Sequence, residues 1–339
     1  MMNAFQKKGE FALIRLIATD LDGTLLEANG TLPENTFNVV RRLNQMGIRF
    51  AASSGRQHGN LIRLFGSVAD SMDFVCENGA VNIADGKEVG IIAIPDRLAY
   101  EAIADLEALG MNLVVSGRHT CYMLDSNRNF TDDITYRLRN TVTMIGSWDE
   151  IAEPILKVAG QIDTGVKALA PQLLQKWSSR LTATVSGTEW FDLTAANKGM
   201  GMQMLMDYLK IKPEETMAFG DNFNDETMLD CVGYPFLMEH ADPALRKPGV
   251  RLCTKVLPVL EKLIEAGGDP EPLQARQGGV AVREDGQGRT SQDAGRLQVG
   301  APTVRRERGR ADGGANMSQL MAMELGFHFP TSAFLSSFN

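Results

Sequence analysis

Short apolar runs that end in polar loops recur along this chain. The first spans residues 13–18 and leads directly into Asp20, Asp22 and Gly23. A continuous apolar run of this length, bounded by turn residues, is typical of a strand that is buried on both faces of a sheet. The same pattern predicts further strands at residues 48–52, 74–76 and 217–219.

Between these runs, apolar residues recur at the spacing of a helix. Phe37, Val40 and Leu43 fall on one helical face. Pro33 and Gly47 flank them, and these residue types favour the first turn and the end of a helix. The same reasoning predicts helices at residues 199–209, 225–230 and 256–266. Strands and helices that alternate in this order predict an α/β fold, with a Rossmann-like parallel sheet and helices on both of its faces.

The middle of the chain has a different pattern. Residues 98–109 are amphipathic and end at Gly110, and the apolar residues 111–115 follow as a strand. No polar cluster follows a strand in this stretch, whereas ligands of open α/β sheets bind at such strand ends. We therefore expect a core domain built from residues 10–85 and 189–266, with residues 86–188 inserted as a separate α+β domain.

The composition changes abruptly at Gly267. Residues 267–339 are rich in glycine and arginine and contain no lysine, tyrosine or tryptophan. Such a segment cannot bury enough apolar surface to offset the entropy lost on ordering. We expect this extension to be disordered up to about Asn316, with a short helix or an apolar tail after it. A foreign extension is an alternative, and we assign the segment no function.

The bulk composition narrows the range of functions. The 339 residues are 44% hydrophobic and 22% charged, which is ordinary for a globular protein of two domains. A net charge of −8 argues against a nucleic-acid-binding protein, because that role needs a cationic surface. No run approaches the roughly 20 apolar residues of a membrane span. The N-terminus lacks the cleavage site of a signal peptide, and none of the four cysteines forms a Cys-x-x-Cys pair, so we expect a cytoplasmic protein with a small-molecule partner.

Two carboxylates follow the first predicted strand. Asp20 and Asp22 stand in a loop that Gly23 and Thr24 allow to turn sharply. An ordinary acidic turn would look the same, since short motifs of this kind also arise by chance. The functional interpretation is phosphoryl transfer, in which Asp20 is a nucleophile that forms an aspartyl phosphate. Asp22 can protonate the leaving alkoxide and later accept a proton from the attacking water.

These charges and a dianionic substrate would repel one another without a cation. Mg²⁺ fits, because it binds oxygen ligands octahedrally and keeps several waters. Asp221 follows the strand at residues 217–219 and is a candidate ligand, with Asn224 and Asp225 at the start of the next helix. The alternative is that Asn224 or Asp225 is the N-cap of that helix, and the two interpretations are compatible.

The oxygens of a phosphoryl group also need hydrogen-bond donors. Ser54 offers a hydroxyl, and the backbone at Gly55 and Arg56 offers amides at a strand end that precedes a helix. Lys198 adds a full positive charge that can offset developing negative charge. Taken alone, Lys198 would be interpreted as an exposed residue at the start of a helix.

These segments, in this order, resemble the haloacid dehalogenase superfamily and its Cof-type phosphatases. The likeness spans residues 13–266, and it includes Asn78-Gly-Ala80 before the insert, which is similar to the substrate-capping domain called C2B. The segments that match the four motifs of the superfamily are Asp20-Leu-Asp-Gly-Thr24, Ser54-Gly-Arg56, Lys198-Gly199 and Gly220-Asp-Asn-Phe-Asn-Asp225.

The resemblance implies a role for each matching residue. Asp20 is then the nucleophile, and Asp22 is the general acid and base. The ligands of Mg²⁺ are Asp20, the backbone carbonyl of Asp22, and Asp221, with Asp225 supporting them from behind. The residues that bind the phosphoryl group or the substrate are Ser54, Gly55, Lys198 and Asn224.

The predicted function is a Mg²⁺-dependent phosphatase for a small organic phosphate, with sugar phosphates as the leading class by resemblance. A phosphomutase or phosphotransferase would use the same intermediate but pass the phosphoryl group to a second hydroxyl. A non-catalytic phosphoaspartate switch is a further alternative. The inserted domain and Asp22 argue against such a switch, because a switch needs only one short domain and Asp22 would speed the loss of the phosphoryl group.

Overall fold

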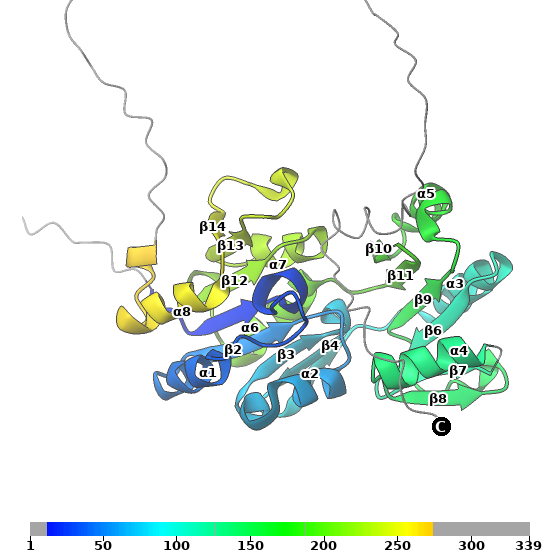
Figure 1. Ribbon diagram of the computed structural model, residues 1–339, viewed down its shortest axis with the longest axis horizontal. Helices are drawn as coiled ribbons and strands as arrows, with labels where there is room; N and C mark the ends of the chain where they lie inside the picture. The colour runs from blue at the N-terminus through cyan, green and yellow to red at the C-terminus, as the bar shows by residue number, and fades with distance from the viewer. Residues whose placement is uncertain (1–11, 126, 187, 274–339) are drawn as a thin grey trace, which may run out of the picture. The chain divides into compact units, whose positions relative to one another are not determined.

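Two β-sheets organise the part of the chain that the structure describes. This computed structural model describes residues 12–125, 127–186 and 188–273, which fall in one compact unit and form a sheet of eight strands and a sheet of six (Figure 1). The C-terminal extension predicted to be disordered lies outside the described residues, apart from its first seven. Within those seven, Leu273 is buried against the core of the first sheet.

The first sheet is mostly parallel. Its strands, in spatial order, are β14 (Arg251–Cys253), β13 (Tyr234–Met238), β12 (Thr216–Gly220), β1 (Leu16–Thr19), β2 (Arg49–Ser53), β3 (Asp73–Cys76), β4 (Val81–Ala84) and β5 (Lys87–Ile91). The strands from β14 to β3 are parallel, and β4 and β5 extend one edge as an antiparallel hairpin. The central strand β1 pairs with β12 on one side and β2 on the other, so it brings distant parts of the sequence together.

Helices cover both faces of this sheet, because the side chains of each strand alternate between two apolar clusters. Ile17 of β1 belongs to one cluster, and Leu16 and Ala18 belong to the other. The helices that pack into the first cluster are α1 (Thr36–Gln45), α2 (His58–Phe65) and α8 (Val256–Glu265). Those of the second cluster are α6 (Lys198–Leu209) and α7 (Glu226–Asp230). The predicted α/β architecture is confirmed.

The second sheet is mostly antiparallel. Its strands, in spatial order, are β10 (Thr182–Ser186), β11 (Trp190–Thr194), β9 (Lys157–Gln161), β6 (Asn112–Ser116), β7 (Cys121–Leu124) and β8 (Val142–Ile145). Only the pair of β7 and β8 is parallel among these strands. The helices among them are α3 (Asp96–Ala108), α4 (Arg128–Asp132) and α5 (Ala170–Trp177). Leu106 of α3 and Trp177 of α5 are buried in one cluster with Val158 and Phe191 of this sheet.

The boundaries between the two sheets lie a few residues after the domain boundaries expected at residues 85 and 188. β5 continues the first sheet beyond residue 85, and β11 belongs to the second sheet although it follows residue 188. Asp85 and Gly86 both have positive φ, 52° and 67°, and they form the tight turn between β4 and β5. The glycine taken as a domain boundary is therefore a hairpin turn. The division into a core and an inserted domain stays a prediction.

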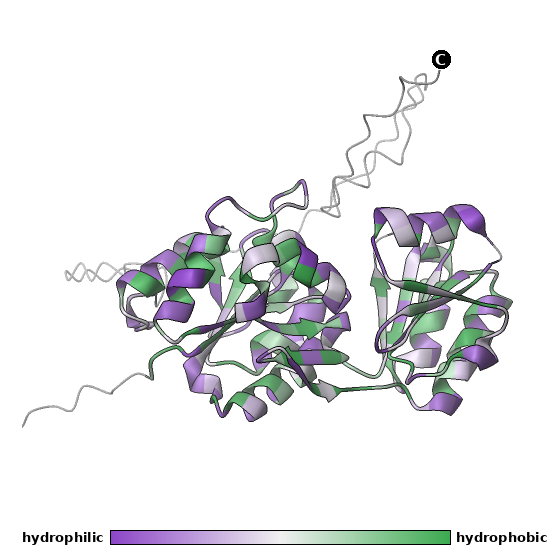
Figure 2. Ribbon diagram, turned by 90° about the horizontal axis from the view of Figure 1, so that it is seen from below, coloured by the Kyte–Doolittle hydropathy of each residue, from purple (hydrophilic) through white to green (hydrophobic). Residues whose placement is uncertain are grey.

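The apolar positions gather in the strands and on the inner sides of the helices. Figure 2 shows the helices with both hydrophilic and hydrophobic stretches, as expected for helices that cover a sheet. All four cysteines lie in the described residues and are free thiols. Among the described residues, no helix is both long and apolar enough to cross a bilayer.

Candidate active site

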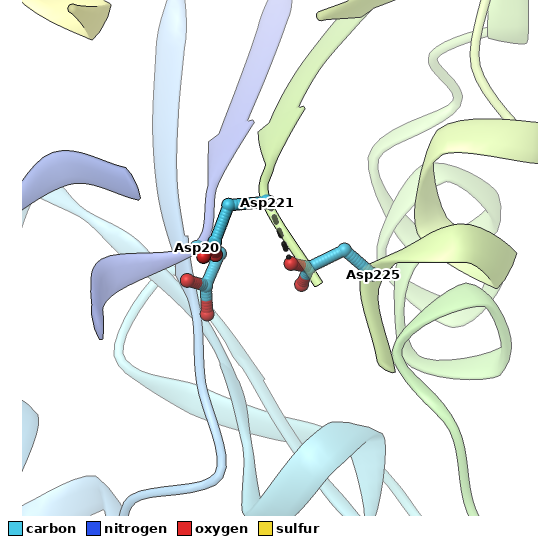
Figure 3. Close-up of side chains that lie close together, drawn as sticks. All are labelled: Asp20, Asp221 and Asp225. Carbon is cyan, nitrogen blue, oxygen red and sulfur yellow. Dashed lines mark hydrogen bonds between the residues drawn. The ribbon is translucent and has the colours of Figure 1, made fainter. Parts of the chain in front are cut away.

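Asp20 and Asp221 meet because their strands are neighbours. Asp20 follows β1 and Asp221 follows β12, and these two strands pair in parallel with Thr19 opposite Phe219. The amide of Asp20 continues the ladder by donating to the carbonyl of Phe219 at 2.9 Å. Both side chains thus project from the carboxyl edge of the sheet, where Figure 3 shows their carboxylates beside each other.

Asp225 joins them from the turn before α7. Its Oδ2 accepts hydrogen bonds from the amides of Asp221 and Asn222, each at 3.0 Å, and the residue is fully buried. A Cβ at Gly220 would collide with the Asp225 side chain, so this position needs glycine. The carboxylate therefore turns back to the loop. Asp225 makes no side-chain hydrogen bond as the N-cap of α7, but it forms a capping box with Asn222 at the helical turn Phe223–Asp225 before that helix, so the capping alternative considered from sequence holds in part.

Lys198 lies between two of these carboxylates. Its ammonium is 2.5 Å from Asp20 Oδ1 and 2.6 Å from Asp225 Oδ1, and its side chain is 0% exposed. The residue opens α6, where Asn197 accepts a hydrogen bond from the amide of Met200 at 2.9 Å and so fixes the start of the helix. The interpretation of Lys198 as an exposed helix start is wrong, because the helix points this end into the site.

The charges of this buried cluster do not balance. The pKa of Asp20 is raised to about 8, because burial raises it most, Lys198 lowers it, and the negative charge of Asp225 raises it again. Desolvation by itself would lower the pKa of Lys198, but the two carboxylates outweigh it and the pKa is raised. The pKa of Asp221 is also raised, by burial and then by Asp225. One ammonium thus faces three carboxylates, an arrangement that favours an additional cation.

The carboxylate oxygens show which residues can hold that cation. Ligand atoms of Asp20, Asp221 and Asp225 lie within 4.8 Å of one another. Both oxygens of Asp225 are already engaged by Lys198 and by the two loop amides. Lys198 contacts only one oxygen of Asp20, and Thr24 donates to Oδ1 of Asp221 at 3.0 Å, which leaves Oδ2 facing His240 at 3.7 Å. Asp20 and Asp221 therefore fit a hard divalent cation, and Asp225 fits the supporting role.

Asp22 lies apart from the three-carboxylate cluster. Its carboxylate accepts two hydrogen bonds from Arg56, at 3.1 Å from Nε and 2.5 Å from Nη2. The two side chains are 46% and 35% exposed, so this pair is accessible from solvent. Gly23, between Asp22 and Thr24, has a positive φ of 86°. A Cβ at this position would collide with the Asp221 carboxylate. Glycine is needed at this position for both reasons.

Ser54, Gly55 and Asn224 come together around Asn78. Ser54 is buried at the end of β2, and its hydroxyl accepts a hydrogen bond from the amide of Arg56 at 3.3 Å. A Cβ at Gly55 would lie 3.2 Å from the Asn78 amide nitrogen, and Asn224 Nδ2 donates to Asn78 Oδ1 at 3.4 Å. The second and fourth motif segments thus share one neighbour, although 170 residues separate Ser54 from Asn224 (224 − 54).

Three side chains of the site were not assigned from sequence. Arg56 was considered only for its backbone amide, Thr24 only for the turn, and Asn78 only as part of a resemblance. The side chains of Arg56 and Thr24 each bind a carboxylate, of Asp22 and Asp221 respectively. The polar segment after β3 was the available signal for Asn78, because it ends a strand of the same sheet edge.

Known proteins are similar to this chain over most of its length. The sequence model of the haloacid dehalogenase-like hydrolase family matches residues 17–249. The 5-amino-6-(5-phospho-D-ribitylamino)uracil phosphatase YbjI of Escherichia coli is 25% identical over 266 residues, covering 74% of this chain and 97% of that relative.

Two solved structures share the fold. A haloacid dehalogenase-like hydrolase from B. subtilis has a TM-score of 0.62 at 24% identity, covering 74% of this chain and 99% of its own. The haloacid dehalogenase subclass IIB sugar phosphatase BT4131 has a TM-score of 0.62 at 19% identity, covering 75% of this chain and 100% of its own.

Proposed function

Because this chain belongs to the haloacid dehalogenase-like hydrolase family, we propose that it is a Mg²⁺-dependent phosphatase that hydrolyses a small phosphomonoester through an aspartyl phosphate. The membership confirms the resemblance drawn from sequence and, with the phosphatase among its relatives, the class of enzyme. The observation that carries the mechanism is the buried Lys198, which bridges Asp20 and Asp225 at 2.5 and 2.6 Å.

Asp20 is the nucleophile. Lys198 holds Oδ1, so Oδ2 is the oxygen that attacks phosphorus, and the bond between phosphorus and the leaving oxygen breaks as the new bond forms. Lys198 keeps positive charge beside Asp20 and favours its ionised form. Burial still leaves the pKa of Asp20 at about 8, so full ionisation near neutral pH would need the further positive charge of a bound cation.

Asp22 is the general acid and base. It donates one to the leaving alkoxide in the first step, and it accepts one from the water that attacks the aspartyl phosphate in the second. Its pair with Arg56 is partly exposed, and exposed ion pairs contribute only about 0–1 kcal/mol, so exchanging this partner for substrate costs little. The second step returns Asp20 and releases inorganic phosphate.

The remaining groups bind the phosphoryl oxygens and the cation. Ser54, Gly55 and Asn224 supply hydrogen-bond donors around Asn78, and Lys198 supplies charge. Mg²⁺, held by Asp20, the carbonyl of Asp22, and Asp221, would neutralise charge between the carboxylates and the phosphoryl group. Asp225 orients this set through the loop amides.

We assign the second sheet and its helices to a substrate-capping domain of the C2B type, inserted between β5 and α6, so that it begins and ends a few residues after the expected bounds 86–188. Sugar phosphates are the proposed substrates. The support is that a relative acts on a phosphoribitylamino compound and that a structural neighbour is a sugar phosphatase. A cytoplasmic location belongs to the same proposal, and the free cysteines are compatible with it.

The test is phosphate release from a panel of sugar phosphates and other phosphorylated metabolites, with and without Mg²⁺. Asp20→Asn should abolish turnover and trapping of radiolabelled phosphate on the protein. Asp230→Asn is the matched control, because that aspartate is 50% exposed and pairs only with Lys247 in the described residues. Hydrolysis by Asp20→Asn at more than a small fraction of the wild-type rate would refute the nucleophile.

The choice of acceptor is tested in the same assay. Release of inorganic phosphate without any added sugar identifies a hydrolase, whereas turnover that requires a second hydroxyl compound identifies a phosphotransferase or phosphomutase. A phosphoaspartate that persists for many minutes would instead indicate a switch.

A further inference from the structure

The turn Glu77–Gly79, which follows β3, contacts the phosphate-binding segments. The amide of Asn78 donates to the carbonyl of Ser54 at 3.0 Å. The side chain of Asn78 accepts from Asn224 at 3.4 Å. One residue of this turn therefore fixes both the second and the fourth motif segments.

The same turn also contacts the start of α6. A Cβ at Gly79 would collide with the carbonyl of Asn197, the residue before Lys198. That carbonyl accepts the first hydrogen bond of the helix, from the amide of Gly201 at 3.2 Å. A shift of the turn would therefore displace the start of α6, which carries Lys198.

The turn has an unfavourable backbone conformation. Glu77 has φ of 49° and Asn78 has φ of 55°, both in the left-handed region although neither is glycine. Such conformations persist only where the surroundings hold them. One stabilising contact is a backbone hydrogen bond, in which the amide of Glu77 donates to the carbonyl of Arg56 at 3.1 Å.

A second stabilising contact is an ion pair with a residue of the second sheet. Lys157 begins β9, and its ammonium lies 2.5 Å from Glu77 Oε2. The two side chains are 15% and 5% exposed, so water screens the pair little. Desolvation alone would lower the pKa of Lys157, but Glu77 and Asp192 raise it, so Lys157 keeps its positive charge at neutral pH.

Lys157 is itself held in place. The preceding residue, Leu156, is fully buried in the apolar cluster of the first sheet. The carbonyl of Leu156 accepts from the hydroxyl of Thr194 at 2.9 Å, and the carbonyl of Ile155 accepts from the amide of Ile94 at 2.8 Å. The second sheet thus presents Lys157 to the turn from a fixed position.

We propose that Lys157 is a positioning residue for phosphoryl transfer, which acts through Glu77 to hold the turn that aligns Ser54, Asn224 and the start of α6. This inference rests on the proposed function. It assigns to the inserted domain a part in building the phosphate site itself, in addition to any contact with the leaving group.

The consequence is measurable with p-nitrophenyl phosphate, which has no sugar for a capping domain to recognise. A residue that only contacts the leaving group would leave its kcat unchanged, whereas misalignment of the phosphate-binding groups would lower it. Small displacements of catalytic groups reduce rates by up to about 100-fold. We expect kcat to fall at least roughly 10-fold when the pair is removed, with a smaller change in KM.

The variant to measure is the double substitution Lys157→Met with Glu77→Gln. It removes both charges of the buried pair, so it avoids the instability expected of either single change. Lys157→Arg keeps the charge and should recover at least half of the wild-type kcat. Arg118→Met is the matched control, because Arg118 also joins the two sheets, through Glu88 of β5 at 2.7 Å, but that pair is 42% and 25% exposed and contacts none of the site segments.

The outcomes separate the proposals. An active wild type, a slow double variant, and wild-type rates for Arg118→Met would support the role of Lys157. A double variant with wild-type kcat, or an equal loss in Arg118→Met, would overturn it. So would a double variant that is unfolded at the assay temperature, because the pair would then act on stability. An inactive wild type would count against the proposed function itself.

Discussion

Replacing Lys198 by methionine tests the electrostatic account of the site most directly. Methionine keeps much of the length and apolar stem of lysine but removes the ammonium. Asp20, Asp221 and Asp225 would then face one another without the charge that now lies 2.5 Å from Asp20 and 2.6 Å from Asp225. We expect losses both in stability and in rate.

The geometry sets the size of the stability loss. At an effective dielectric constant of about 20, unit charges 2.5 Å apart attract by about 7 kcal/mol, and Lys198 makes two such contacts. Most of this attraction offsets the desolvation of the charges, and removing one partner of a buried pair costs about 3–5 kcal/mol. At about 2–4 °C per kcal/mol, the thermal midpoint should fall by roughly 6–20 °C. The kcat should fall by about 10²–10³, as for the loss of one donor to developing charge.

The assay compares Lys198→Met with Lys176→Met. Lys176 lies 2.6 Å from Asp105, the same separation as in the Lys198–Asp225 pair, but its side chain is 45% exposed. An exposed pair contributes about 0–1 kcal/mol, so this control should shift the thermal midpoint by no more than about 4 °C. For the wild type and both variants, we would measure the thermal midpoint in EDTA and in Mg²⁺, and then kcat for p-nitrophenyl phosphate.

Equal shifts in the two variants would refute the reasoning, because they would show that burial does not govern the strength of these ion pairs. A Lys198→Met protein that keeps its stability but loses its rate would confine the role of Lys198 to catalysis. In the expected case, Mg²⁺ restores part of the lost stability, since a bound cation replaces part of the missing positive charge.

Three further variants test the rest of the site. Asp22→Asn should slow hydrolysis of alkyl phosphates far more than of p-nitrophenyl phosphate, whose leaving group needs little protonation; equal losses on both substrates would point to a role in metal binding or structure. Asp221→Ala should raise the Mg²⁺ concentration needed for half-maximal rate, and EDTA should abolish the activity of the wild type. An unchanged Mg²⁺ requirement in the variant would show that Asp221 is not a ligand of the metal. Gly23→Ala should raise the Mg²⁺ requirement in the same way, because its Cβ would displace the Asp221 carboxylate, whereas Gly47 has a similar φ, 75°, and no atom within 4 Å of an added Cβ, so Gly47→Ala should leave the requirement unchanged.

Much of the first sheet could be predicted from local sequence. The predicted strand at residues 48–52 is β2 at Arg49–Ser53, and the predicted helix at residues 199–209 is α6 at Lys198–Leu209. These elements follow from apolar runs, helical periodicity and glycine stops, which depend on neighbours in sequence. The β4–β5 hairpin was missed, since its turn at Asp85-Gly86 also fits a linker.

The candidate site was predictable as a set of residues but not as a network of contacts. Placing Asp20 and Asp221 at one sheet edge requires only that both follow parallel strands. The burial of Lys198 could not be predicted, because it depends on Asp20 and Asp225, which are far from it in sequence. The pairing of Asp22 with Arg56 likewise depends on how two loops approach each other. The roles of the individual residues stay predictions until the variants are measured.

The position of β1 has a consequence for how this chain is made. β1 needs β12 on one side, and the two strands are paired at Leu16 and Thr216, so 200 residues separate them (216 − 16). While the chain emerges from the ribosome, β1 and β2 can pair, but the other edge of β1 stays open until β12 appears. Contacts of such high sequence separation form slowly, and an open apolar strand edge invites pairing with other chains. The second sheet, whose six strands all lie between Asn112 and Thr194, can fold earlier. Nascent chains stalled before residue 216 should therefore depend on chaperones, and their aggregation should fall once β12 has been synthesised.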